Sequence, residues 1–170
     1  MTPAVAELAA LTRWTRPRTA TDWLPVERRL GLPVPASFKE LAETFGPGEF
    51  SQYLFLAGPG DERAAHSLAR ESAAWLFPGA ADLLHPYPPP GEPGGPVPWG
   101  GTCHGDVFFW LPDSADPDTW PVLALGESTD RHRFDLTVPE FVLEAVRPGG
   151  TVDPFAVGDL VPPSFLPAAP

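Results

Sequence analysis

Two kinds of hydrophobic pattern occupy different parts of the chain, and their order limits the fold more than any single motif. Four segments before residue 78 have apolar residues at helical spacing, at about 3–15, 21–31, 35–46 and 61–77. Four short apolar runs follow closely at 97–103, 106–111, 120–125 and 131–136. Helices first, then strands mostly in one block, predict an α+β fold and not an alternating α/β fold.

The strand signals predict a central antiparallel sheet. The run 52–58 is short and aromatic and ends before Gly-Pro-Gly, which favours a further strand. His104 and Gly105 separate two later runs and suit a hairpin turn, because glycine tolerates positive φ. Turn residues at 114–118 and 126–130 then join the remaining runs into a meander. We expect about five strands packed on the helices.

Local signals mark the ends of several helices. Gly31 and Gly46 stand where the second and third helices are expected to end. Thr137 and Glu140 form a T-x-x-E capping box that opens a C-terminal helix, and Pro148 stands at its end.

The 25 prolines and 16 glycines are concentrated in two places, and they suggest the domain boundaries. One is 78–98, which we interpret as a long loop, and the other is the end of the chain from residue 148. We therefore expect an N-terminal helix and extension over 1–19, a domain over 20–147 that contains the loop, and a proline-rich tail over 148–170.

Composition excludes several classes of partner. The chain has 11 basic and 22 acidic residues, a net charge of −11, so it repels nucleic acid phosphates and attracts a basic protein. Cys103 is the only cysteine, which excludes an internal disulfide and fits a reducing compartment. The N-terminal residues do not resemble a secretory signal, and no apolar stretch approaches the roughly 18 residues of a membrane span. We expect a cytoplasmic protein that binds neither nucleic acid nor membrane.

The motifs of catalysis and metal binding are missing or incomplete. Gly126, Glu127 and Ser128 begin a nucleophile-elbow pattern, but Asp130 replaces its last glycine. Cys103 and His104 are adjacent on an expected strand and point to opposite faces, which disfavours a shared metal ion. We expect no enzymatic activity, no metal and no cofactor.

The most informative charge feature is a 71–130 span without lysine or arginine, flanked by Arg70 and Arg131. Loops at one end of a meander lie close together, so we expect several of its acids to share one face that could enter the basic substrate groove of a partner. Tyr87, in a proline-rich stretch, is a candidate apolar anchor. The candidate partner-binding residues are Asp82, Tyr87, Glu92, Asp106, Asp113, Asp116, Asp118, Glu127 and Asp130. A solvated loop face is the competing interpretation.

Two groups of residues resemble the SUKH superfamily over roughly positions 20–147. The first is an opening signature that includes Trp23, Glu27, Leu30, Gly31, Leu32, Pro33, Phe38, Gly46 and Gly48. The second, similar to the central hairpin of the family, includes Trp99, Gly100, Gly105 and Trp110. We interpret most of these residues as structural, because buried aromatic residues chiefly supply core area.

The resemblance implies a function in protein binding. Bacterial members are often immunity proteins that neutralise polymorphic toxins, many of them nucleases or deaminases, and fungal relatives regulate cell-wall synthesis through protein partners. We therefore expect a protein that binds a basic toxin domain through its acidic surface. The alternative is an intracellular regulatory or scaffold protein of the same fold that has no toxin partner.

Overall fold

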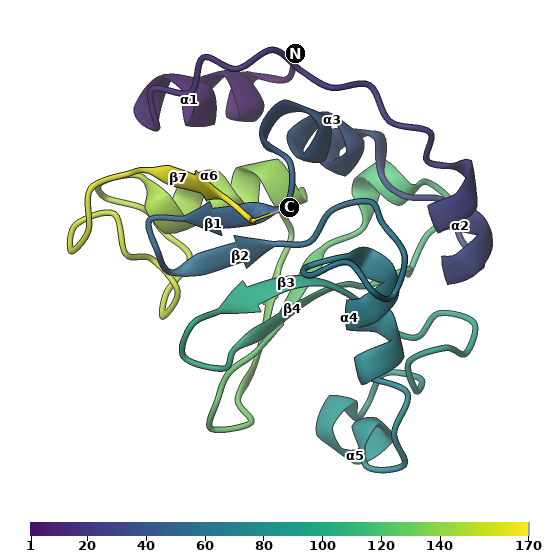
Figure 1. The fold of residues 1–170 in the computed structure, drawn as a ribbon. Helices are drawn as coiled ribbons and strands as arrows, with labels where there is room; N and C mark the ends of the chain where they lie inside the picture. Colours follow the sequence, from purple (N-terminus) through teal and green to yellow (C-terminus); the bar gives the residue numbers. More distant parts are fainter. Residues whose placement is uncertain (170) are drawn as a thin grey trace.

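The computed structural model describes residues 1–169 and is α+β, with helices against both faces of one sheet (Figure 1). The helices are α1 (Pro3–Leu11), α2 (Leu24–Leu30), α3 (Ala36–Phe45), α4 (Leu68–Ala74), α5 (Ala80–Leu84) and α6 (Val138–Val146), with a 3-10 turn η1 (Pro117–Thr119). The strands are β1 (Gly48–Phe50), β2 (Leu54–Leu56), β3 (Val97–Thr102), β4 (Val107–Trp110), β5 (Val122–Leu125), β6 (Arg131–Phe134) and β7 (Phe165–Pro167).

The strands form one antiparallel sheet in the order β6-β5-β4-β3-β2-β1-β7. The expected meander is confirmed, since β3, β4, β5 and β6 are neighbours in sequence order. The turn between β3 and β4 is longer than the two residues expected. The hydrogen bond that closes it runs from Thr102 N–H to the Asp106 carbonyl at 3.0 Å. Gly105 lies in this turn with a φ of +94°.

Within residues 1–169 the sheet has seven strands where about five were expected, because β1 and β7 form pairs that the local pattern does not signal. β7 lies beside β1, with Gly48 opposite Pro167. A side chain at position 48 would collide with the Leu166 carbonyl oxygen, so glycine permits this close pairing. The segment expected as a tail therefore supplies an edge strand, and its Val152 and Phe155 belong to the main core.

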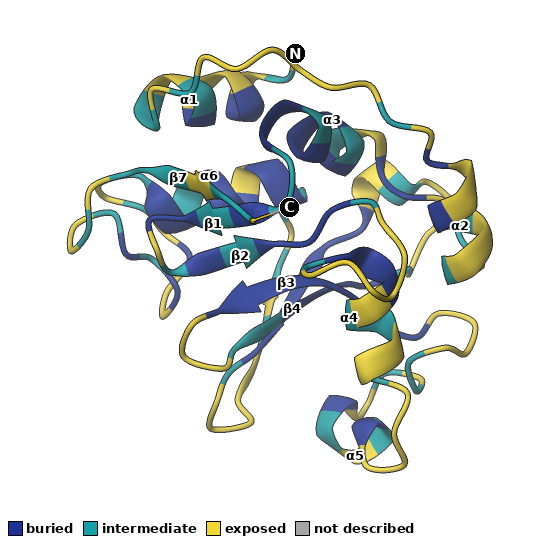
Figure 2. Cartoon of the chain, in the orientation of Figure 1, coloured by how far each residue is buried: buried dark blue, intermediate teal, exposed yellow. Residues whose placement is uncertain are grey.

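Aromatic rings fill the main core between the sheet and the helices α1, α3 and α6. Phe38 of α3 is fully buried, and its ring centroid lies 4.8 Å from Trp110 and 6.5 Å from Trp99. Trp23, just before α2, contacts the same phenylalanine at 6.2 Å. Figure 2 shows the result, with α3 and β3 largely buried and the hairpin turns and the outer sides of α2 and α4 exposed.

A smaller core covers part of the opposite face of the sheet. Successive side chains of a strand alternate between faces, so Phe109 points away from its neighbours Phe108 and Trp110. Phe109 packs with Leu84 of α5. Trp75, which follows α4, meets Phe109 edge to face at 4.8 Å. The loop predicted over 78–98 therefore contains a helix that helps to cover the sheet.

The helix expected over 61–77 is wrong in its first half, because α4 begins only at Leu68. Ser67 is the N-cap residue, and its hydroxyl accepts a hydrogen bond from Arg70 N–H at 3.1 Å. His66 has a φ of +54°, which interrupts any helix that comes before it. The Asp61 carboxylate accepts from Arg63 N–H at 2.9 Å and forms a local turn instead.

The residues of the opening signature connect α2 to α3. Gly31 ends α2 with a φ of +72°, and Gly46 ends α3 with a φ of +79°, as expected. The Glu27 carboxylate accepts from Val34 N–H at 2.9 Å and pairs with Lys39 at 2.6 Å, so it fixes the link between the two helices.

The capping box of Thr137 and Glu140 opens the C-terminal helix α6, as expected from the sequence.

Glu43 fastens the segment before α2 to α3. Its carboxylate accepts hydrogen bonds from Trp23 Nε1 at 2.8 Å and from Arg18 Nε at 2.8 Å. Burial works to raise the pKa of this carboxyl group, but the hydrogen bonds from Trp23, Arg18 and Thr21 outweigh it, so the pKa lies below its ordinary value.

Replacing Glu43 by glutamine tests this anchor. A group whose pKa is lowered on folding stabilises the protein above its unfolded pKa, near 4.5, and that stabilisation is lost as the pH falls through the folded pKa. We expect Glu43→Gln to lower the free energy of unfolding by about 1–2 kcal/mol at pH 7. The deficit should shrink as the pH falls below about 4. Urea unfolding at pH 7 and at a pH below about 4 measures this deficit. A deficit that does not change with pH would show that the ionised Glu43 carboxylate is not the stabilising group.

Candidate partner-binding surface

The candidate acidic residues lie at two ends of the sheet and not on one face. Because adjacent strands run in opposite directions, the β3–β4 and β5–β6 turns lie at one end and the β4–β5 loop lies at the other. The first end carries Asp106, Glu127 and Asp130, and the second end carries the residues of the β4–β5 loop. Three of the candidate acids therefore share one end of the sheet, and the acids of the β4–β5 loop lie at the other end.

At the first end, Asp106 holds two turns together. One carboxylate oxygen accepts from Glu127 N–H at 3.0 Å, and the other contacts the Thr102 hydroxyl. Burial raises the pKa of nearby Tyr53 to about 12, and the negative charge of Asp106 adds to this effect. Glu127 and Asp130 are exposed, and their carboxylates have no ion pair within residues 1–169.

At the second end, the three aspartates of the β4–β5 loop have structural contacts. Asp113 pairs with Arg133 at 3.1 Å. Asp116 accepts from Asp118 N–H at 3.1 Å and so begins the 3-10 turn η1. Asp118 accepts from Ser37 N–H at 2.8 Å, which satisfies one of the free amides at the start of α3.

The remaining candidates come from the segment between α4 and β3. Asp82 is exposed in the first turn of α5. Tyr87 is half-buried against the second core, so part of its side chain is already packed within the fold. Glu92 is exposed and makes no side-chain hydrogen bond or ion pair within the described chain.

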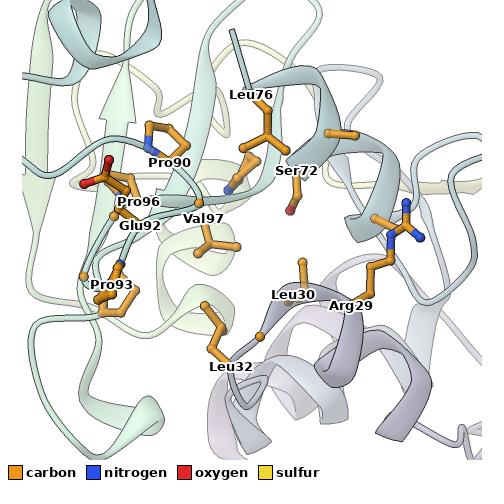
Figure 3. A pocket seen from close by; sticks show the side chains of 18 of the residues that line it. Arg29, Leu30, Leu32, Ser72, Leu76, Pro90, Glu92, Pro93, Pro96 and Val97 are labelled. Atoms are coloured by element: carbon orange, nitrogen blue, oxygen red, sulfur yellow. The ribbon is translucent and has the colours of Figure 1, made fainter. Parts of the chain in front are cut away.

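A hollow of about 450 Å³ lies beside Glu92, and we call it the α2–α4 groove. Its walls are the end of α2 with the residues after it (29–32), one side of α4 with Leu76 (69–76), the loop 90–98, and Pro112 and Trp120. Figure 3 shows Leu76 and Ser72 pointing into the hollow and Leu30 and Leu32 facing them from the opposite wall.

The lining is mainly apolar and rich in proline, and it continues onto the surface. Leu76 is 64% exposed and the next residue, Phe77, is 43% exposed. The loop is held close to α4 at Gly91, which has a φ of +87° and lies against the Leu76 side chain. Exposed apolar side chains beside a hollow are typical of a surface that another molecule covers.

Few polar groups line the groove. Arg29 and Glu62 form an ion pair at its edge. The Ser72 hydroxyl oxygen is buried and has no hydrogen-bond partner within residues 1–169. Glu92 lies on the loop side, with its carboxylate turned away from the hollow (Figure 3).

Sequence reasoning missed the α2–α4 groove. The sequence indicates a structural role for Leu30, Gly31 and Leu32, and its pattern places Ser72 and Leu76 in one long helix. The one signal in the sequence was the loop 78–98 with its many prolines, because residues 90–98 supply nearly half of the lining.

The described residues contain no group of three or more His, Cys, Asp or Glu side chains that could hold a metal ion. None of the helices within 1–169 has both the length and the apolar character that a bilayer span requires. In comparisons with known proteins, no family model, no curated protein and no solved structure matches this chain.

The contact of Asp118 with α3 gives a testable prediction. We expect Asp118→Ala to lower the free energy of unfolding by about 1 kcal/mol, because a helix amide loses its acceptor. Glu127→Ala is the control, since its exposed carboxylate makes no such bond, and it should change stability by less than about 0.5 kcal/mol. Urea denaturation measures both, and equal effects would show that the Asp118 bond does not stabilise α3.

Proposed function

We propose that this chain is a SUKH-type domain that works by binding a protein partner, and that it neutralises a polymorphic toxin of the nuclease or deaminase type. The order of elements supports the fold assignment: helices with a Leu-Pro link, a β1–β2 hairpin, a long connection, a meander and a C-terminal helix. The motif residues Trp23, Phe38, Trp99 and Trp110 are core residues, which is the role expected of family signature positions.

The observation that carries the proposal is the position of the α2–α4 groove next to uncompensated acidic residues. Protein interfaces combine an apolar centre with a polar rim. Here the apolar lining is bordered by Glu92 and by the β4–β5 loop that carries Asp116 and Asp118. None of these three carboxylates has an ion pair within the described residues. A basic partner with an apolar contact residue matches both properties.

The chemistry of the lining favours binding over catalysis. Ser72 is the only hydroxyl side chain among the described lining residues, and no histidine or lysine stands there to activate it. The carboxylates of the lining are not hydrogen-bonded to Ser72, whose hydroxyl has no partner within residues 1–169, so no activated nucleophile supports covalent catalysis here. The apolar lining therefore supports binding of a side chain more than a reaction on it.

Co-expression with the product of the neighbouring gene tests the proposed role. If that gene encodes a toxin, growth should stop when the toxin is expressed alone and should resume when this protein is present. The two purified proteins should also form a stable complex. A toxin that remains active in the presence of excess protein would refute the immunity role, and a neighbour that binds without being toxic would favour the regulatory alternative.

Two exposed glutamates form a matched pair for locating the binding surface. Glu92→Lys and Glu127→Lys change the net charge equally, but only Glu92 borders the groove. We expect Glu92→Lys to weaken partner binding about tenfold and Glu127→Lys to change it less than about threefold, because screening limits charge effects to about 8–10 Å.

Calorimetry at low and physiological salt measures both variants. The affinity of the unmodified protein should fall as salt rises, and the effect of Glu92→Lys should shrink with it. Equal effects of the two substitutions would mean that only net charge matters, and this would contradict the placement of the partner at the groove.

A further inference from the structure

We propose that the α2–α4 groove binds an extended segment of the partner, in which an aliphatic or aromatic side chain stands next to an arginine or lysine. This inference rests on the proposed function, because it names the part of the partner that the same surface recognises. Three features of the groove carry it: the apolar lining with its exposed rim, the free hydroxyl of Ser72, and the charges around the edge.

The apolar lining fixes the kind of side chain that can enter. Leu30 and Leu32 from one wall and Leu76 from the other converge on the hollow, and Val97 closes its base (Figure 3). An aliphatic or aromatic side chain that enters removes its own apolar surface and that of these residues from water. A polar side chain would lose its hydration here and gain almost no partners.

The exposed rim favours a chain segment over a small molecule. Ligand pockets for small molecules enclose most of the ligand surface. Leu76 and Phe77, in contrast, extend the apolar surface beyond the hollow, where an enclosed ligand would leave them uncovered. A chain segment that places one side chain inside the hollow and continues outward covers both the hollow and the exposed side chains of Leu76 and Phe77.

The path of the segment is indicated by a second hollow of about 650 Å³. Arg29, Glu62 and Ala69 line both hollows, so the two meet at the Arg29–Glu62 ion pair. Pro25, Val26 and Pro59 continue the apolar lining on the far side. An extended chain can therefore run past the ion pair, which is about half exposed at both partners.

Ser72 supplies a polar contact that the fold itself does not use. Its hydroxyl is buried at the wall of the groove and has no partner within the described chain. Buried polar groups are nearly always hydrogen-bonded in native structures. Rotation of the Ser72 side chain toward the hollow would let this hydroxyl form a hydrogen bond with a backbone N–H or C=O of the bound segment.

The charges around the groove select the flanking residue. Arg29 is the only cation that lines the first hollow among the described residues, and Glu62 already neutralises it. Glu92 at the loop side and the β4–β5 loop beyond Trp120 leave a net negative edge. A lysine or arginine next to the inserted side chain of the partner is attracted by this negative charge, and an acidic residue there is repelled.

A blocked six-residue peptide with two central leucines flanked by arginines is the probe. We expect it to bind the full-length protein with a dissociation constant below about 1 mM. Two comparison peptides, with serines in place of the leucines or glutamates in place of the arginines, should bind at least about tenfold more weakly. Titration calorimetry measures the affinities. Equal affinity for all three peptides would overturn the proposal, and so would tight binding of decane or oleate with no peptide binding.

Adjacent alanines of α4 provide a matched pair of variants. Ala73 and Ala74 are both exposed, but only Ala73 lines the groove. Ala73→Trp should fill the hollow and lower the affinity for the leucine–arginine peptide at least about tenfold, whereas Ala74→Trp should leave it unchanged. Equal affinities of the two variants would overturn the proposal. Thermal melting of both variants checks that each is folded.

Ser72→Ala is the second variant, and it does not depend on filling the groove. Because the hydroxyl has no partner among residues 1–169, its removal should leave the melting temperature unchanged or raise it. The affinity for the peptide should fall about threefold to tenfold. Unchanged affinity would show that the Ser72 hydroxyl does not contact the bound peptide.

The same variants measured against the whole partner separate this inference from the proposed function. If the partner binds Ala73→Trp and Ala74→Trp equally well, the groove proposal is wrong and the partner-binding function stands. If no neighbouring-gene product binds the unmodified protein while the peptide still binds in the groove, the groove proposal stands and the immunity role fails.

Discussion

The position of Phe38 decides how the helices lie on the sheet. This residue of α3 is fully buried, and its ring contacts Trp110 of β4, Trp99 of β3 and Trp23 just before α2. One side chain therefore ties together three segments that are far apart in the sequence. Large aromatic rings bury much apolar surface and meet edge to face, so such contacts are both strong and directional.

The α2–α4 groove exists because of this arrangement. The contact with Trp23 fixes where α2 begins, and Gly31 ends the helix so that Leu30 and Leu32 reach the hollow. The contacts with Trp99 and Trp110 fix β3 and β4, whose ends carry Val97 and Pro112 on the other side. A rigid core thus holds a surface hollow open, with apolar walls that no other part of the described chain covers.

Local chemistry could be predicted from the sequence, whereas long-range pairing could not. The glycine ends of α2 and α3, the capping box of Thr137 and Glu140 and the meander depend on neighbouring residues, and they were correct. β1 and β7 were missed, because each has three residues and the pair joins positions near 49 and 166.

The candidate site was harder to predict for a related reason. Strand direction divides the acidic residues between two ends of the sheet, and several of them form local bonds, as Asp106 and Asp118 do. The groove is built from short segments that lie far apart between residues 29 and 120, and no single segment carries a pattern that indicates it. What the sequence did indicate was the excess of acid and the long proline-rich loop.

Hydrogen exchange of the protein, alone and in complex with its partner, shows whether the partner binds at the α2–α4 groove. If the partner binds at the α2–α4 groove, amide protection should rise in 29–32, in 68–77 and in 90–98, and it should stay unchanged in the turns 103–106 and 126–130. Protection confined to those two turns, or no change in the three groove segments, would contradict binding at the groove.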